Sequence, residues 1–448
     1  MTTTAAEHVD PATLRKVIVA AAIGNFVEWF DFAVYGFLAT TIALQFFPSG
    51  DTSAALLKTF AVFAVAFAFR PLGGIFFGML GDRIGRKRTL AMTILLMAAA
   101  TTLIGLLPTY AAIGVTAPIL LTIIRCAQGF SAGGEYAGAC AYLMEHAPRT
   151  QRAWYGSFVP VSTFSAFAAA AVVAYALEAS LSAEAMGSWG WRLPFLIAAP
   201  LGLVGLYLRW KLDETPAFQA VTKEHAVAHS PLKETLRNHA AAICCLGAFV
   251  SLTALSFYMF TTYFATYLQV AGGLSRASAL LVSLIALAFA AAICPLAGAC
   301  SDRVGRRVTM ATACILLMLV VFPSFLMASS GSFAASVIGV MLLAVGAVLC
   351  GVVTAALLSE TFPTRTRYTA SAITYNMAYT LFGGTAPLMA TLLISTTGSN
   401  LSPAFYLIAV AVMAMVGGLA LPETSRVSLH DVAVADESVA APSAHTHA

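Results

Sequence analysis

A short charged motif occurs twice in the chain, each time between two long apolar runs. Residues 78–88 and residues 298–307 both fit the frame G-x-x-x-D-R-x-G-R-[KR]. A second frame, E-x-x-P-x-x-x-R, begins at Glu145 and again at Glu360. The two frames recur in the same order at nearly the same offset, 220 residues (Asp302 against Asp82) and 215 residues (Glu360 against Glu145). Such a repeat indicates two homologous halves.

The composition places both halves in a membrane. Of the 448 residues, 60% are hydrophobic and only 10% are charged, whereas soluble proteins carry about 25% charged residues. A helix needs about 20 apolar residues to cross a bilayer. The chain offers twelve such runs, which we expect to form an all-α membrane protein: 17–47, 55–80, 89–108, 112–145, 152–178, 190–210, 238–270, 276–300, 308–328, 332–361, 367–397 and 401–421.

The basic residues predict the orientation of these helices. With the N-terminus in the cytoplasm, 19 of the 24 Lys and Arg residues fall on the cytoplasmic side and three fall outside, as the positive-inside rule favours. We therefore expect a cytoplasmic N-terminal segment (1–16), a six-helix bundle (17–210), a cytoplasmic linker (211–237), a second six-helix bundle (238–422) and a disordered cytoplasmic tail (423–448).

Several classes of function find no support in the sequence. The eight cysteines have no metal-binding spacing, and the net charge of +4 includes no basic face for nucleic acid. No nucleophile–base pair and no phosphate-binding loop is visible, so we expect no enzyme. The linker and the tail are too short for a soluble output domain, which argues against a sensor. No cofactor is expected apart from a coupling proton.

Five further segments, together with the duplicated motifs, resemble one family. They read GNFVEWFDF at 24–32, FRPLGG at 69–74, QGFSAGGEY at 128–136, WGWRLPF at 189–195 and DETPAF at 213–218. From about residue 15 to 425 the chain resembles the metabolite:proton symporters of the major facilitator superfamily. The resemblance implies two pseudo-symmetric six-helix halves that transport by alternating access. It also implies a bacterial plasma membrane location, contact with the bilayer, and a functional monomer.

Within that family the first half indicates a substrate class more decisively than the second half does. Residues 69–87, 127–138 and 201–209 are most similar to members that carry proline and glycine betaine, whereas 257–263 and 382–384 resemble carboxylate carriers as much. The resemblance implies a proton symporter of a small carboxylate-bearing osmolyte. The alternative is a symporter of a di- or tricarboxylate such as α-ketoglutarate or citrate. Residues 423–448 lack the heptad segment of the osmosensing members, which puts osmotic regulation in doubt.

Ionisable side chains inside the predicted spans are concentrated in the first half. They are Glu28, Asp31, Arg70, Arg125 and Glu135. Charges inside a membrane are costly and usually functional. Three acids face two arginines, so at least one acid is available to bind and release a proton. We expect Glu28, Asp31 or Glu135 to couple proton movement, and the alternative is permanent ion pairs that lock helices together.

The substrate is expected to contact cationic, aromatic and amide side chains. Arg125 can offer a two-pronged donor to a carboxylate. Aromatic faces attract a quaternary ammonium, which has no hydrogen to donate. The predicted substrate site comprises Tyr35, Arg125, Gln128, Tyr136, Phe257, Tyr258, Tyr263, Tyr375 and Asn376.

The duplicated motifs are expected to close the cytoplasmic side when the site faces outward. The predicted gating residues are Arg70, Asp82, Arg86, Glu145, Asp302, Arg306 and Glu360. The alternative for these motifs is a loop that only fixes topology.

Overall fold

The computed structural model describes residues 11–84, 86–134, 136, 140, 143–144, 147–211, 239–362 and 367–425, and these residues are helical with short turns and no strand. The predicted linker lies almost wholly outside the described residues, as do most of the N-terminal segment and the tail. The proposed domain boundaries therefore stay predictions.

The first half contains six helical passes, most of them bent or interrupted. The first is α1 (Pro11–Phe37) with α2 (Ala39–Phe46), the second α3 (Thr52–Ala68) with α4 (Arg70–Ile84), and the third α5 (Arg86–Leu106). After α6 (Tyr110–Ile113), α7 (Thr116–Ser131) and η1 (Ala132–Gly134) form the described part of the fourth. The remaining passes comprise η2 (Arg149–Gln151), α9 (Arg152–Gly156), α10 (Phe158–Ser180), α11 (Ala183–Ser188), η3 (Gly190–Arg192), α12 (Leu193–Leu196) and α13 (Ala198–Lys211).

The second half repeats this count with straighter helices. Its passes comprise α16 (Ala240–Tyr258), η4 (Met259–Tyr263) and α17 (Phe264–Val270), then α18 (Arg276–Val304), α19 (Arg306–Ala328) and α20 (Phe333–Glu360), then α21 (Arg367–Ala378), η5 (Tyr379–Gly383), α22 (Ala386–Thr397) and α23 (Ser402–Ala420). Both η4 and η5 are π-helical turns, a feature that often occurs at functional sites.

The described helices occupy all twelve predicted spans. Nine of them are long and apolar enough to cross a membrane, and α1 with α2 makes a tenth that is bent by 63°. The third pass has the shorter apolar stretch Ala91–Leu106, and α7 with η1 begins the fourth. Two starts differ by four residues or more: α1 begins at Pro11 instead of residue 17, and α7 begins at Thr116 instead of residue 112, because Gly114 has φ of +59° and separates α6 from α7. The predicted all-α, twelve-helix architecture is confirmed.

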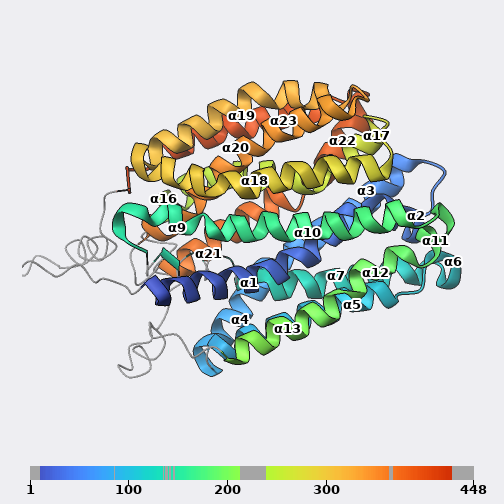
Figure 1. Cartoon of the computed structure of the whole chain (residues 1–448), viewed down its shortest axis with the longest axis horizontal. Helices are drawn as coiled ribbons and strands as arrows, with labels where there is room; N and C mark the ends of the chain where they lie inside the picture. Colours follow the sequence, from blue (N-terminus) through green and yellow to red (C-terminus); the bar gives the residue numbers. More distant parts are fainter. Residues whose placement is uncertain are drawn as a thin grey trace, which may run out of the picture.

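The two halves lie side by side along the helix direction. Figure 1 shows the later helices α18, α19, α20 and α23 above, and the early helices α4, α5, α7 and α13 below. Helix α10 packs on α18, and α3 packs on α22, so both pairs join one half to the other. Because α1 contacts η4 and α17, the acidic residues of α1 lie near this interface.

Glycines bring the second and fourth passes into backbone contact. A Cβ added at Gly73 would collide with the carbonyl of Phe130, and one added at Gly129 would collide with the carbonyl of Ala66. A Cβ at Gly133 would meet the carbonyl of Arg70. Small residues allow membrane helices to approach this closely. The glycines of 69–74 and 128–136 thus place Arg70 beside the fourth pass.

Candidate functional site

Arg70 lies among aromatic rings near the interface of the halves. Its side chain is 1% exposed, and Nη2 lies 3.5 Å from Oε1 of Glu28. The same nitrogen donates to the carbonyl of Ala132 at 3.3 Å. Its guanidinium carbon lies 5.8 Å from the ring centre of Trp29 and 5.3 Å from that of Phe67. Arg70 was predicted to be a gating residue, and that role stays a prediction; the structure places its side chain beside Glu28 and these aromatic rings.

Arg125 is fully buried inside the first half. Its Nη1 donates to Oε1 of Gln128 at 2.7 Å, and Nε2 of Gln128 donates to the hydroxyl of Thr101 at 2.6 Å. The guanidinium lies over the ring of Tyr35 at 4.2 Å. The Tyr35 hydroxyl donates to the carbonyl of Thr59 at 3.0 Å. Among the described residues, Nε and Nη2 of Arg125 have no hydrogen-bond partner, so two donors remain for another group.

Asp31 completes this group on α1. The carboxylate is 2% exposed and interacts with the Thr101 hydroxyl and with the charge of Arg125. Its Oδ2 accepts no hydrogen bond from the part of the chain that the structure describes. Arg125, Gln128, Thr101 and Asp31 therefore form one polar group that joins the first, third and fourth passes.

Asn25 holds α1 against α10, and it was not among the predicted site residues. Its Nδ2 donates to Ser162 Oγ at 2.8 Å and to Thr163 Oγ1 at 2.7 Å, while its Oδ1 accepts from Trp29 Nε1 at 2.9 Å. Asn25 thereby fixes the Trp29 ring, which faces the second half. The sequence does contain a signal for this contact. Asn25 lies one helical turn before Trp29, and the adjacent hydroxyl residues Ser162 and Thr163 lie in the apolar fifth span.

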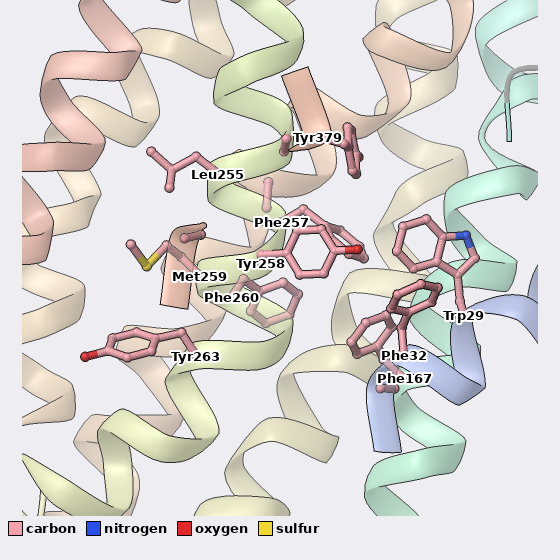
Figure 2. Close-up of a cluster of buried hydrophobic side chains, with 14 of the residues drawn as sticks. Trp29, Phe32, Phe167, Leu255, Phe257, Tyr258, Met259, Phe260, Tyr263 and Tyr379 are labelled. Carbon is pink, nitrogen blue, oxygen red and sulfur yellow. The ribbon is translucent and has the colours of Figure 1, made fainter. Parts of the chain in front are cut away.

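Aromatic side chains from both halves meet beside these charges, and Figure 2 shows part of this cluster. The ring centres of Trp29 and Phe257 are 5.2 Å apart, and those of Phe67 and Tyr258 are 5.2 Å apart. The Tyr258 hydroxyl points toward Trp29 in Figure 2 and finds no hydrogen-bond partner among described residues. We call this set the aromatic cluster: Trp29, Phe32, Phe63, Phe67, Phe257, Tyr258 and Tyr379.

A stack of tyrosines extends the aromatic cluster from the fourth pass to the eleventh. Tyr136 and Tyr375 are parallel at 4.4 Å, and Tyr375 and Tyr379 lie 3.9 Å apart. The neighbouring Asn376 donates from Nδ2 to the carbonyl of Gly133 at 2.7 Å. Tyr136, Tyr375 and Asn376, which were predicted to belong to one site, therefore lie together at the contact between the halves.

Tyr263 lies apart from the other predicted substrate residues. Its ring points away from Trp29 in Figure 2 and lies 6.2 Å from Phe60. With Tyr267 and Thr391 it lines a cavity of about 40 Å³ near the ends of α3 and α22. Tyr258 immediately precedes the π-helical turn η4 and Tyr263 is its last residue, and the two side chains contact different parts of the interface.

Contacts between the halves close the end of the bundle opposite the repeated motifs. Thr40 Oγ1 donates to Gln269 Oε1 at 3.2 Å. Arg276 Nη1 donates to Thr41 Oγ1 at 3.4 Å and lies 4.0 Å from Glu178 Oε1. These contacts tie the first and fifth passes to the seventh and eighth.

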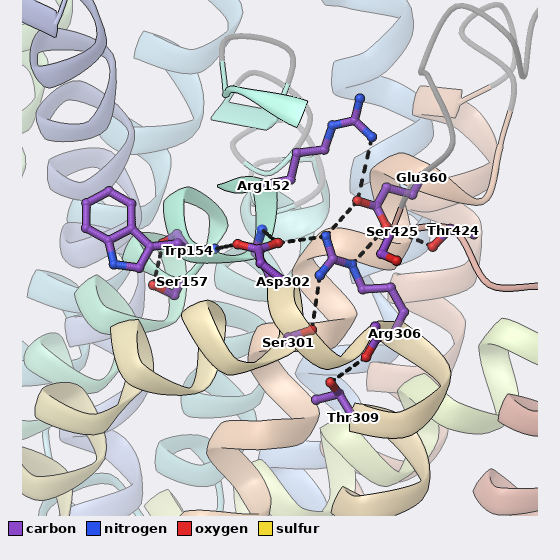
Figure 3. A network of polar contacts seen from close by, with 12 residues as sticks. Arg152, Trp154, Ser157, Ser301, Asp302, Arg306, Thr309, Glu360, Thr424 and Ser425 are labelled. Atoms are coloured by element: carbon purple, nitrogen blue, oxygen red, sulfur yellow. Dashed lines mark hydrogen bonds and ion pairs between the residues drawn. The ribbon is translucent and has the colours of Figure 1, made fainter. Parts of the chain in front are cut away.

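A denser polar network closes the other end, and Figure 3 shows it. Arg306 donates from Nε and Nη2 to both carboxylate oxygens of Glu360 at 3.0 Å, and from Nη2 to Asp302 at 3.0 Å. Asp302 in turn accepts from the backbone nitrogens of Ala153 and Trp154 at 3.0 and 2.9 Å. We call these contacts the inner latch, because Asp302 joins the second half to the start of α9 in the first.

Glu423, just after the last helix, caps the helix that follows the second motif. Its carboxylate accepts from the backbone nitrogens of Arg306 and Arg307, both at 2.9 Å. Thr424 donates to Glu360 at 2.8 Å. Partial burial disfavours the charged carboxylate, but the hydrogen bonds from backbone donors outweigh the effect of burial and lower the pKa of Glu423 to about 2. Residues 423–448 were predicted to form a disordered tail, and the contacts of Glu423 and Thr424 with Arg306, Arg307 and Glu360 were not predicted.

Some predicted residues cannot be placed. Glu135 and Glu145 lie outside the described residues, and the backbones of Asp82 and Arg86 are helical while their side chains are not described. The equivalent of the inner latch in the first repeat therefore stays a prediction.

One cavity of about 10 Å³ lies beside Glu28, and another of about 40 Å³ lies beside Tyr263. One water needs about 10–15 Å³, so neither cavity admits a small osmolyte. Contacts between the described parts of the two halves are present at both ends of the bundle.

Comparisons with known proteins agree with this geometry. A model of the Major Facilitator Superfamily matches residues 21–387. A proline/betaine transporter of Salmonella typhimurium is 38% identical, over 93% of this chain and 85% of that protein. A glycine betaine/proline/ectoine/pipecolic acid transporter of Dickeya dadantii is also 38% identical, with the same coverage. An ectoine/proline transporter of Corynebacterium glutamicum is 37% identical, over 93% of this chain and 86% of its own.

Solved structures share the fold at lower identity. The proton:xylose symporter XylE bound to 6-bromo-6-deoxy-D-glucose is similar with a TM-score of 0.74 and 17% identity, covering 95% of this chain and 100% of the other. The partially occluded, inward-open xylose transporter XylE from E. coli gives a TM-score of 0.68 at 19% identity, covering 93% and 100%.

Proposed function

The chain belongs to the Major Facilitator Superfamily, and from this premise we propose that it is a proton-coupled importer of a small zwitterionic osmolyte such as proline or glycine betaine. The relatives whose names include proline, betaine or ectoine support this substrate class. It functions as a monomer in a bacterial inner membrane, with both termini in the cytoplasm and no cofactor besides the coupling proton.

The observation that carries the proposal is the junction of buried charge and aromatic rings at the interface of the halves. The Arg125 donors left unpaired in the described part of the chain suit a carboxylate. The aromatic cluster suits the cationic end of a zwitterion, at about 0.5–2 kcal/mol for each well-placed ring. Trp29 and Phe67 come from the first half, while Phe257 and Tyr258 come from the second. A ligand held between them contacts both halves at once.

The charge balance favours a zwitterion over a dicarboxylate. Within the described passes, Glu28 and Asp31 face Arg70 and Arg125, so these four charges sum to zero when all are ionised. A zwitterion leaves that sum unchanged, whereas a dicarboxylate adds two negative charges to a low-dielectric site. The alternative substrate, a di- or tricarboxylate, requires Arg70 to leave Glu28 and join Arg125 as a second cation.

Proton coupling is assigned first to Asp31. Its carboxylate is buried, lies beside Thr101 and Arg125, and sits one helical turn from Glu28. Protonation of Asp31 removes its attraction for Arg125, so the guanidinium is free to turn toward a substrate carboxylate. The proton and the substrate are then bound together before the halves rock and the inner latch opens.

Transport by proteoliposomes under an imposed inward proton gradient tests the proposal. Labelled glycine betaine is supplied, with unlabelled proline, α-ketoglutarate, citrate and shikimate as competitors. We expect gradient-dependent accumulation of betaine that proline alone inhibits. Accumulation of a labelled dicarboxylate without betaine uptake would overturn the substrate class and favour the alternative.

A further inference from the structure

A small cavity lies inside the first half, next to Glu28. Its volume is about 10 Å³, and its polar lining consists of Glu28, Thr93 and Ser131. A buried water needs about 10–15 Å³ and two to four polar partners. The cavity provides both, between the first, third and fourth passes.

The lining groups have complementary hydrogen-bonding capacity. Ser131 donates its hydroxyl hydrogen to the Gln128 carbonyl at 2.8 Å, so its lone pairs remain as acceptors. A protonated Glu28 can donate to a water, and that water can donate to Ser131. Thr93 offers a hydroxyl that both donates and accepts. A single water in the cavity can therefore hydrogen-bond with all three groups.

The cavity also lies in the direction that a released proton must take. Glu28 precedes Asp31 by three residues, about 4.5 Å along the helix axis, and is nearer to the N-terminus of α1. Figure 1 shows that this end of α1 lies at the same end of the bundle as α9, which belongs to the inner latch. The cavity thus continues the path from Asp31 toward the cytoplasmic side.

We propose that this cavity holds one water that conducts the coupling proton out of the site, with Thr93 and Ser131 as the residues that position it. The inference rests on the proposed function, because it assumes proton coupling through Asp31 and Glu28. Described ionisable groups that act near Glu28 are Arg70 of α4, Asp31 of α1 and Tyr258 of α16.

The proton count balances in one relay step. Asp31 gives its proton to Glu28, and protonated Glu28 gives one proton to the water. Once the inner latch opens and solvent reaches the cavity, the water passes another of its protons to a solvent water on the cytoplasmic side and is restored as neutral water. Glu28 returns to the carboxylate form that pairs with Arg70, so the step ends with Arg70 held as in the present structure.

Substitutions of the two hydroxyl residues test this relay. Thr93→Val keeps the side-chain shape and removes the hydroxyl, Ser131→Ala removes the second, and Thr93→Ser restores a hydroxyl at the first. Thr102→Val is the matched control, because Thr102 lies on the same helix and donates to the Ala98 carbonyl at 2.7 Å without lining the cavity. Each variant is assayed in proteoliposomes for gradient-driven betaine uptake and for betaine counterflow at equal pH.

We expect Thr93→Val and Ser131→Ala to lower gradient-driven uptake by about tenfold or more, as loss of a proton-transfer partner does. Counterflow needs no net proton movement and should stay within about twofold, and Thr93→Ser and Thr102→Val should match the wild type. Unchanged gradient-driven uptake in both variants, or equal loss of uptake and counterflow, would overturn the inference. Should Thr93→Val fail to fold, Ser131→Ala and Thr93→Ser decide the question. A wild type without gradient-driven uptake would instead refute the proposed function.

Discussion

Single residues decide how proton and substrate are linked in this account. Asp31 of α1 and Arg125 of α7 both contact the group formed by Thr101 and Gln128. Their residue types and spacing were enough to predict a charged site in the first half, because the few ionisable residues within apolar spans are easy to recognise in the sequence. The role of Thr101 was not predictable, because it depends on partners in other helices, whereas Asn25 had a signal in its spacing from Trp29 that was not used.

Replacement of Asp31 by Asn should separate transport from the proton gradient. The amide cannot exchange a proton, so gradient-driven accumulation should fall by about 100-fold, a typical effect of losing a proton-transfer group. Betaine counterflow should persist. Glu184→Gln, at an exposed carboxylate in α11, is the matched control. If Asp31→Asn still concentrates betaine against a gradient, another acid carries the proton.

Replacement of Arg125 by Lys should weaken substrate binding while preserving charge. Lysine cannot offer two parallel donors and cannot stack flat on Tyr35 as the guanidinium does at 4.2 Å. We expect the concentration for half-maximal betaine binding to rise by about tenfold, which corresponds to about 1.4 kcal/mol. Isothermal titration in detergent measures this. An unchanged affinity would remove Arg125 from the substrate site.

At the level of elements, glycines and π-helical turns position the site. The close contact of the second and fourth passes depends on Gly73, Gly129 and Gly133, and the sequence showed these glycines without showing what they touch. Hydropathy predicted the spans well because the bilayer requires about the same minimum length of apolar helix in each of them. It could not predict η4 or η5, since a π-helical turn adds a residue without changing composition.

Replacement of Gly73 by Ala should destabilise the protein. The added methyl meets the carbonyl of Phe130, a backbone atom that cannot turn aside, and such overpacking costs about 1–3 kcal/mol. We expect a lower melting temperature in detergent by scanning fluorimetry. Gly351→Ala is the control, because a Cβ there meets nothing within 4 Å. Equal melting temperatures for the two variants would contradict the packing argument.

At the level of the whole molecule, the two ends of the interface differ in strength. The inner latch joins the halves through a carboxylate and two backbone donors at 3.0 and 2.9 Å, whereas the opposite end depends on contacts of 3.2 to 4.0 Å. The duplicated motifs indicated two halves from the sequence alone. The contacts of Asp302 with α9 and of Glu423 with α19 were not predicted, because each joins residues that are more than 100 positions apart in the sequence.

Replacement of Asp302 by Ala should shift the population toward the conformation that is open to the cytoplasm. The change removes both acceptors of the Ala153 and Trp154 nitrogens, so the closed inner end loses its shortest polar contacts between the halves and keeps the weaker Arg152–Glu360 ion pair at 3.8 Å. Double electron–electron resonance spectroscopy should then give a longer distance between two spin labels, one on the cytoplasmic end of each half. Asp51→Ala, at the exposed cap of α3, is the control. An unaltered distance distribution would exclude a latch function.

Glu423 should contribute to stability through its charge over a defined pH range. Its pKa is lowered from 4.5 to about 2 in the folded protein. The stabilisation is therefore complete above about pH 4.5 and is lost as the pH falls toward 2. Glu423→Gln should melt at a lower temperature than wild type at pH 7, and the difference should shrink below pH 4.5. A difference that is constant down to pH 3 would contradict this assignment.

The central claim is that each imported zwitterion is accompanied by a proton. Proteoliposomes adsorbed to a solid-supported membrane electrode, given a rapid jump of glycine betaine at equal pH on both sides, test it directly. A neutral substrate carries no net charge, so coupling predicts a transient of positive charge into the vesicles that Asp31→Asn abolishes. Betaine uptake without any charge movement would contradict proton symport.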